Sequence, residues 1–464
     1  MKWQSWARVP WLCAVLAGCS VGTPYRRPDI PLPQQWHEAS GADAAAAAVW
    51  PSADWWHGFG SARLDELIAQ AERTNDDLAG AIARVREADA QARIAGAPLL
   101  PQVDLGAAAT RERTNVYGQG PSVFNQFNPE LTASYEIDFW GKNRALRDAA
   151  RAAAAASRYD QQTVALTVIS SVATSYFQAL ELRDRIQVAY QNLANGQQIL
   201  RGLLLEQTAG TATGLDVAQQ DTAVALLNAA IPPLEEQFRQ TVYALAVLIG
   251  KTPESIDVNS GTLTGLTSPA VVAGLPSELL ARRPDVAEAE EQLISANADI
   301  TVARAALFPS IVLTASGGYE SSMLSSLVNP ANRIYALSGG LTQPIFHGGA
   351  LRGALAYSKA HYDELLASYH KTVLTALGNV ESALVAARQT EDQYQRQRDA
   401  VAKARRAYEF AQAQMSAGTV NVLTVLNTEN ALFSAQDSLV QVQYTHLQAL
   451  VDLFTALGGG WHEG

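Results

Sequence analysis

The stretch SAGTVNVLTVLN, residues 416–427, has a near copy, TAGTATGLDVAQ, at residues 208–219. Each stretch interrupts a long helical pattern with a glycine of the kind that ends a helix, and then restarts the pattern with polar residues. This is how an antiparallel helical hairpin is encoded. The sequence therefore predicts two hairpins of one design, whose tips meet at one end of the molecule.

The correspondence between the two stretches extends over most of the chain. Displacements of 207 or 208 residues relate landmarks in the first half to landmarks in the second, which indicates a tandem duplication and not a many-repeat solenoid. The matching pairs are Pro101 and Pro309, Phe139 and Phe346, Gly141 and Gly348, Gly210 and Gly418, and Gly250 and Gly458.

Two helical stretches, 141–207 and 348–417, are each near seventy residues, or on the order of 100 Å at 1.5 Å per residue. The returning segments carry heptad stripes, which predict coiled-coil packing. Glutamines spread over the first long stretch indicate hydrated outer faces. A plain coiled-coil spacer would explain any one stripe by itself. The stripes are Val217, Val224, Ile231, Phe238 and Leu245, and Leu426, Phe433, Val440, Leu447 and Phe454.

Before each of these stretches the apolar period changes from 3.6 to 2. Alternation predicts four strands at about 102–112, 129–138, 309–320 and 333–344, with residues 115–128 as a polar loop. Strands of about ten residues can cross a bilayer when tilted. A membrane barrel tolerates no open edge and needs about eight strands, so the chain is expected to oligomerise. Aromatic residues near strand ends fit a membrane girdle: Tyr135, Phe139, Trp140, Phe308, Tyr319, Tyr335 and Phe346.

The chain starts with the pattern of a secretory signal. Lys2 and Arg8 precede a short apolar run that ends at Leu16-Ala17-Gly18-Cys19. Cys19 at the cut site makes residues 1–18 resemble a lipoprotein signal peptide, with Cys19 as the lipidated N-terminus. Ser20 after it favours sorting to the outer membrane. The alternative is an ordinary signal with an incidental cysteine.

Composition excludes several classes of function. The chain has 464 residues and a net charge of −11, which argues against nucleic acid as a partner. No window after the signal offers eighteen uninterrupted apolar residues, so a helical membrane protein is not expected. The seven histidines are scattered without metal-ligand spacing, and Gly250-Lys251-Thr252 lacks the upstream glycine of a phosphate loop. We expect no catalytic residues, no metal site and no cofactor.

A family resemblance rests on Cys19-Ser20, Trp55-Trp56, the segment Leu64–Ile68, the segment Leu279–Val286, and Phe308-Pro309. With these motifs the chain resembles the TolC-type outer membrane factor family, in its lipoprotein (NodT-like) branch that serves multidrug efflux pumps of the resistance-nodulation-division (RND) type. The resemblance implies an α+β membrane protein in a Gram-negative outer membrane. It implies a homotrimer with a twelve-stranded transmembrane β-barrel, a long periplasmic α-helical barrel and a mixed equatorial domain.

The same resemblance implies an exit duct of a tripartite efflux pump for small molecules such as drugs. The implied partners are a periplasmic adaptor protein, an inner-membrane RND-type pump and the lipid of the outer membrane. Alternatives within the channel class are a type I protein-secretion conduit and a heavy-metal efflux conduit. A periplasmic structural lipoprotein without a pore is the alternative of another class, and four amphipathic strands count against it.

The resemblance also assigns roles at the hairpin tips. Asp216 matches an acidic linking position at the periplasmic aperture, and Leu423 falls on an apolar ring. Thr424 and Asn427 stand where relatives often carry Asp, and Val420 stands where a linking Arg can be, which favours a dewetting constriction at Leu423 over an anionic gate. The adaptor is expected to contact Ala209, Gly210 and Thr211 and the copies Ala417, Gly418 and Thr419.

The expected organisation follows the duplication. After the signal peptide come an extended arm at 19–60, a first repeat at 61–250 and an equatorial connector at 251–275. A second repeat at 276–458 and a tail at 459–464 complete the chain. The long hairpins within the repeats are expected at 141–249 and 348–457.

Overall fold

The computed structural model describes residues 21–38, 51–116, 120–271 and 274–461. Cys19 and the signal segment lie outside the described residues. The chain divides into two compact units, and each unit draws segments from both repeats. One unit holds residues 83–158 and 288–370 with the arm up to residue 29, and the other holds the rest of the chain.

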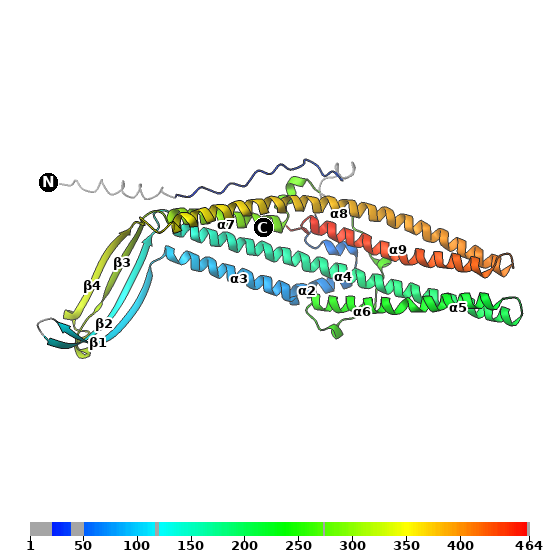
Figure 1. Cartoon of the computed structure of the whole chain (residues 1–464), viewed down its shortest axis with the longest axis horizontal. Coiled ribbons are helices and arrows are strands. Elements are labelled where there is room, and N and C mark those ends of the chain that lie inside the picture. The colour runs from blue at the N-terminus through cyan, green and yellow to red at the C-terminus, as the bar shows by residue number, and fades with distance from the viewer. Residues whose placement is uncertain (1–20, 39–50, 117–119, 272–273, 462–464) are drawn as a thin grey trace. The chain divides into compact units, whose positions relative to one another are not determined.

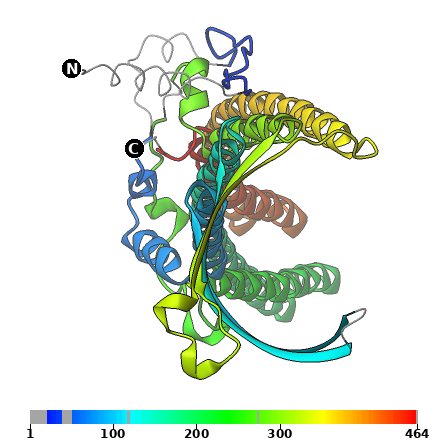
Figure 2. The ribbon, with the colours of Figure 1, turned by 90° about the vertical axis from the view of Figure 1, so that its left-hand side faces the viewer.

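The first unit contains one curved antiparallel sheet with the strand order β1-β2-β3-β4 (Figures 1 and 2). Neighbours in the sheet are neighbours in sequence within each hairpin, and β2 pairs with β3 to join the two halves. Odd-numbered residues pair with odd-numbered residues in all three ladders, so they share one face. The strands are β1 (Gln102–Val116), β2 (Gly120–Ile137), β3 (Ser310–Tyr319) and β4 (Arg333–Thr342).

The prediction of a polar loop at 115–128 was wrong, because β1 and β2 continue through most of this segment as a long hairpin. The ladder runs as far as Val116 opposite Gly120. Polar residues on both faces obscure the alternation in this part, but they pair across the strands, as in the 3.3 Å contact between the hydroxyls of Thr114 and Ser122. The first hairpin is therefore longer than the second.

Helices make up most of the remaining chain. The second arm of the first hairpin is interrupted at Ala230, because Pro232 and Pro233 lack backbone N–H groups and lie at the start of a new helix. The second hairpin has no such break. The helices are α2 (Ala62–Thr74), α3 (Asp76–Gly96), α4 (Lys142–Thr208), α5 (Gly214–Ala229), α6 (Ile231–Leu248), α7 (Pro284–Ala305), α8 (Ala350–Ser416) and α9 (Val422–Ala456).

Among the described helices, only α4 is long and apolar enough to span a membrane by length and composition. Its apolar residues Val172, Phe177 and Leu180 are fully buried in the protein core. Packing in the protein core therefore accounts for part of the hydropathy of α4.

An aromatic cluster forms the core of the second unit. Trp55, in a 3-10 turn at Trp55–Phe59, stacks on Phe454 of α9 with ring centroids 4.9 Å apart. Phe59 is fully buried and contacts Phe177 of α4 at 4.9 Å. The turn Trp55–Phe59 therefore contacts one helix from each repeat, α9 through Trp55 and α4 through Phe59.

The two repeats share the same backbone conformation at two equivalent glycines. Gly250 and Gly458 both adopt positive φ, at 65° and 88°. A Cβ on Gly250 would collide with the carbonyl of Thr74, and a Cβ on Gly458 would collide with the carbonyl of Arg282. Thr74 and Arg282 are themselves 208 positions apart, so both halves use one close backbone approach.

We expect Gly458→Ala to lower the free energy of unfolding by about 2 kcal/mol or more, because it combines a left-handed φ with a backbone clash. Denaturant or thermal unfolding of the purified protein measures the change. Gly378→Ala in α8 is the control, since a Cβ there meets nothing within 4 Å. Equal stabilities of the two variants would contradict the prediction.

Candidate functional site

Both hairpin tips close with the same hydrogen bonds. Gly210 and Gly418 have φ values of 77° and 71°. Thr211 donates from its backbone N–H to the carbonyl of Glu206 at 2.9 Å and from its hydroxyl at 3.0 Å. Thr419 makes the same two bonds to Gln414 at 2.9 and 3.0 Å. These bonds satisfy carbonyls at the helix end, as expected for a left-handed glycine cap.

The helices that follow the tips start with different caps. Thr213 and Asp216 form a capping box on α5, in which Asp216 Oδ2 accepts from the Thr213 N–H at 2.9 Å and from its hydroxyl at 2.7 Å. These hydrogen bonds, the hydroxyl first, lower the pKa of the Asp216 carboxyl. On α9, Asn421 accepts from the Thr424 N–H at 3.2 Å and from the Thr424 hydroxyl at 3.1 Å.

The predicted aperture residues are thereby separated into two kinds. Asp216 and Thr424, which are equivalent in the duplication, both take part in capping their own helices. Leu423 and Asn427 are exposed on α9. Leu215, equivalent to Leu423, is also exposed, at 66% against 48%. Sequence reasoning missed Leu215, although the displacement of 208 residues relates it directly to Leu423.

A packed apolar layer lies just behind the tips and joins the two hairpins. Leu203 of α4 contacts Val422 and Leu426 of α9, all buried, and Val217 of α5 packs against them. The next layer contains Val425, Leu432 and Phe433 of α9 with Tyr408 and Ala411 of α8. The exposed residues Leu215 and Leu423 are therefore on helices whose opposite faces are held by buried apolar packing.

Two buried polar side chains interrupt this packing, and sequence reasoning missed both. Glu429 of α9 is 1% exposed, and its Oε1 has no hydrogen-bond partner among the described residues. Burial raises the pKa of the Glu429 carboxyl to about 7. Gln220 of α5 is fully buried and donates from Nε2 to the carbonyl of Gly196 at 2.9 Å. Each stands three residues after a member of a heptad stripe, Glu429 after Leu426 and Gln220 after Val217, where a coiled coil has its second apolar position, and a polar residue there was the available signal.

An ion-pair network ties α4 to α9 further from the tips. The Arg185 guanidinium donates to Asp437 at 2.6 Å and to Glu181 at 3.0 Å. Burial raises the pKa of the Glu181 carboxyl, while the Arg185 charge opposes that shift. The network is partly buried, so it links one helix of each repeat by charge as well as by apolar packing.

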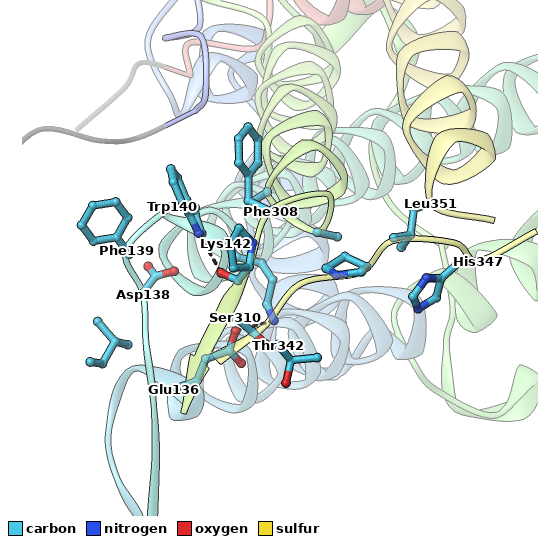
Figure 3. Close-up of a pocket in the computed structure, with 15 residues that line it drawn as sticks. Glu136, Asp138, Phe139, Trp140, Lys142, Phe308, Ser310, Thr342, His347 and Leu351 are labelled. Atoms are coloured by element: carbon cyan, nitrogen blue, oxygen red, sulfur yellow. Dashed lines mark hydrogen bonds and ion pairs between the residues drawn. The ribbon is translucent and has the colours of Figure 1, made fainter. Parts of the chain in front are cut away.

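The junction between the sheet and α4 is a second built feature (Figure 3). Asp138 accepts hydrogen bonds from the N–H groups of Asn143 and Arg144 at 2.9 Å and so caps α4. Trp140 stacks on Phe308 at 4.7 Å and donates from Nε1 to the carbonyl of Pro309 at 2.8 Å. A pocket of about 260 Å³ lies between these groups. The strand end is therefore held rigidly where it converts to helix.

The two faces of the sheet differ in chemistry. Among the described strand residues, the odd-numbered face is apolar over most of its length, and its leucines are exposed, Leu105 by 77% and Leu337 by 78%. The even-numbered face is polar and carries carboxylates at Asp104, Glu112, Glu130 and Glu136. Apolar-out and polar-in alternation is the pattern of a membrane barrel.

A sheet of this kind, continued by long helical hairpins, defines a channel-forming outer membrane protein. The chain belongs to the outer membrane efflux protein family, whose model matches residues 67–251 and 275–459. The two matches are displaced by 208 residues, which confirms the duplication.

Relatives match over nearly the full length. The chain is 40% identical over 455 residues to the pyoverdine export outer membrane protein OpmQ of Pseudomonas putida, covering 96% of this chain and 95% of that one. It is 32% identical over 456 residues to the cation efflux system protein CusC of Escherichia coli, covering 97% and 98%. The solved outer-membrane channel OprN superposes with a TM-score of 0.90 at 27% identity, covering 96% of this chain and all of that one.

These findings confirm the family resemblance, the fold class and the outer membrane location. The structural neighbours are trimeric channels of the TolC type. Four strands from each of three chains therefore close a twelve-stranded barrel in the outer membrane, and the long helical portion lies in the periplasm. The chain serves as an efflux channel, and its family is one of transport conduits.

We expect the wild-type protein to lose stability as the pH rises from about 4.5 to about 7, because buried Glu429 then ionises less readily in the folded state than in the unfolded one. The loss is at most about 3 kcal/mol for this shift. Glu429→Gln should lack the loss, as measured by unfolding at pH 5 and pH 8. Glu409→Gln, at an exposed position of α8, is the control and should keep it. The same pH profile in both variants would exclude Glu429 as the cause.

Proposed function

We propose that the chain is the exit duct of a tripartite pump, joined through a periplasmic adaptor to an inner-membrane RND-type transporter. The observation that carries this proposal is the pair of matched hairpin tips, because each chain presents two nearly identical turns to whatever docks there. Three chains would present six. The docking residues are Ala209, Gly210 and Thr211 and their copies Ala417, Gly418 and Thr419.

Small organic molecules are the proposed cargo, and the protein acts as a conduit without catalysis. The relative named for pyoverdine export, at 40% identity, is more similar than the one named for cation efflux, at 32%. The described residues contain no group of three or more His, Cys, Asp or Glu able to hold a metal ion. We also propose that Cys19 carries the lipid anchor, as its signal-like context predicts.

Deletion of the gene tests the transport role. We expect the deleted strain to become more susceptible to a set of organic drugs and detergents, with wild-type susceptibility restored by the intact gene. Susceptibility to copper and silver salts is measured in parallel. A strain sensitised to the metals alone would replace organic cargo with metal cargo, and a strain with no altered susceptibility would contradict an efflux role.

The closed periplasmic mouth is proposed to be an apolar ring of Leu215 and Leu423 from three chains. Apolar constrictions block ion flow by excluding water. Asp216 supports the ring by capping α5, and its Oδ1 makes no hydrogen bond within the described residues, which leaves it available to a neighbouring coil. The Thr424 hydroxyl donates to Asn421 at the start of α9, and Asn427 is exposed on the same helix.

We expect Leu215→Ala and Leu423→Ala to raise single-channel conductance in planar bilayers several-fold, and the double variant to raise it further. Asp216→Ala should raise it less, because it loosens the cap without removing the apolar ring. Leu205→Ala, an exposed leucine on α4 at 72%, is the matched control and should leave conductance unchanged. Wild-type conductance in both ring variants would remove these leucines from the mouth.

A further inference from the structure

Three arginines lie on the outward face of the sheet, beyond the end of its apolar band. Arg111 and Arg113 belong to β1 and Arg333 is the first residue of β4. All three are odd-numbered and therefore share a face with Leu105, Leu131 and Leu337. All three are exposed, and none forms an ion pair within the part of the chain that the structure describes.

The length of the apolar band places these arginines at a membrane surface. On β2 the apolar odd residues run from Ile137 to Phe127. Ten steps of about 3.4 Å, tilted by about 40°, span about 26 Å, which matches the apolar band of a membrane barrel of about 25 Å. Phe127 pairs with Ala109, and the next odd pair is Arg111 with Asn125. Because the helices at the other strand ends lie in the periplasm, this end faces the outer leaflet.

Arg111 and Arg333 lie at one height in the barrel. Arg111 is nine residues from Gln102, where β1 starts at the helix side, and Arg333 is nine residues from Thr342, where β4 ends at the helix side. The two strands are the open edges of the sheet. If β1 of one chain pairs with β4 of the next to close the trimeric barrel, Arg111 and Arg113 would stand beside Arg333 of the partner subunit.

Charge is segregated between the two faces of the sheet. Among the described strand residues the odd face carries no Asp or Glu, whereas Glu112 and Glu130 lie on the even face towards the lumen. Three cations on one outward face, without carboxylates on that face, form a positively charged surface that would attract an external anion. A guanidinium suits phosphate in particular, since it donates two parallel hydrogen bonds.

We propose that each of the three subunit boundaries binds a phosphorylated lipid of the outer leaflet, the lipid A part of lipopolysaccharide. Arg111 and Arg113 of one chain and Arg333 of the next bind its phosphates, while its acyl chains lie against the apolar band. The site exists only in the trimer, because two chains contribute to it. The proposal rests on the trimeric barrel and not on the cargo or the pump partners.

Native mass spectrometry of the purified trimer tests this site, with bisphosphorylated lipid A as the probe. We expect the wild type to retain up to three molecules and the triple variant Arg111→Ala, Arg113→Ala, Arg333→Ala to bind about tenfold more weakly. The charge-preserving Lys triple variant should bind between the two, because lysine cannot bind a phosphate in bidentate fashion. Arg201→Ala, Arg405→Ala, Arg406→Ala, which removes three exposed arginines from the helices, is the matched control.

The probes separate a lipid site from a general attraction to phosphate. Dephosphorylated lipid A should bind no better to the wild type than to the Ala variant, and inorganic phosphate should not compete at millimolar concentration. Undiminished retention of lipid A by the Ala variant, with the trimer intact by size, would overturn the proposal. Equal retention of the dephosphorylated lipid by the wild type would overturn it as well.

Discussion

The backbone of the two edge strands imposes the constraint on which the rest of the structure depends. In hydrocarbon, an unpaired N–H or C=O costs several kcal/mol, so a transmembrane sheet must have no edges. One chain supplies four strands and leaves β1 and β4 open. Closure requires other chains, and the family solution is three. The curvature of the sheet (Figure 2) and the rigid strand-to-helix junction at Asp138 and Trp140 both serve that closure.

The duplicated halves share a backbone but not its chemistry. Each half has a glycine with positive φ at its hairpin tip. Each half also has a second one, Gly250 or Gly458, against which a backbone carbonyl of the same half packs closely. They differ in the caps of the returning helices, where Asp216 is replaced by Thr424, and in the Pro232 interruption, which α9 lacks. Six coils at the mouth of the trimer are thus of two alternating kinds, so an opening motion need not involve both equally.

Local signals explain what could be predicted from the sequence. Helix-ending glycines, heptad stripes and the change to a period of two are properties of short windows, and they identified both hairpin tips and all four strands. The long β1–β2 hairpin was missed because polar residues occupy both faces of its outer part, with Thr114 and Ser122 on the even-numbered face and Asn115 and Asn125 on the odd-numbered face. Glu429 was missed because its burial arises from packing of α9 between other helices. The available signal was a break in the heptad pattern, because Glu429 stands three residues after Leu426, where an apolar residue is expected.

The open edges of the sheet also have a genetic consequence. Since every barrel is closed by three copies, a variant chain that still pairs its edge strands enters the same trimers as the normal chain. In a cell that makes both in equal amounts, on the order of one trimer in eight would contain only normal copies. A variant that is stable but blocked at its hairpin tips would therefore be dominant, whereas one that fails to pair its edges would be recessive.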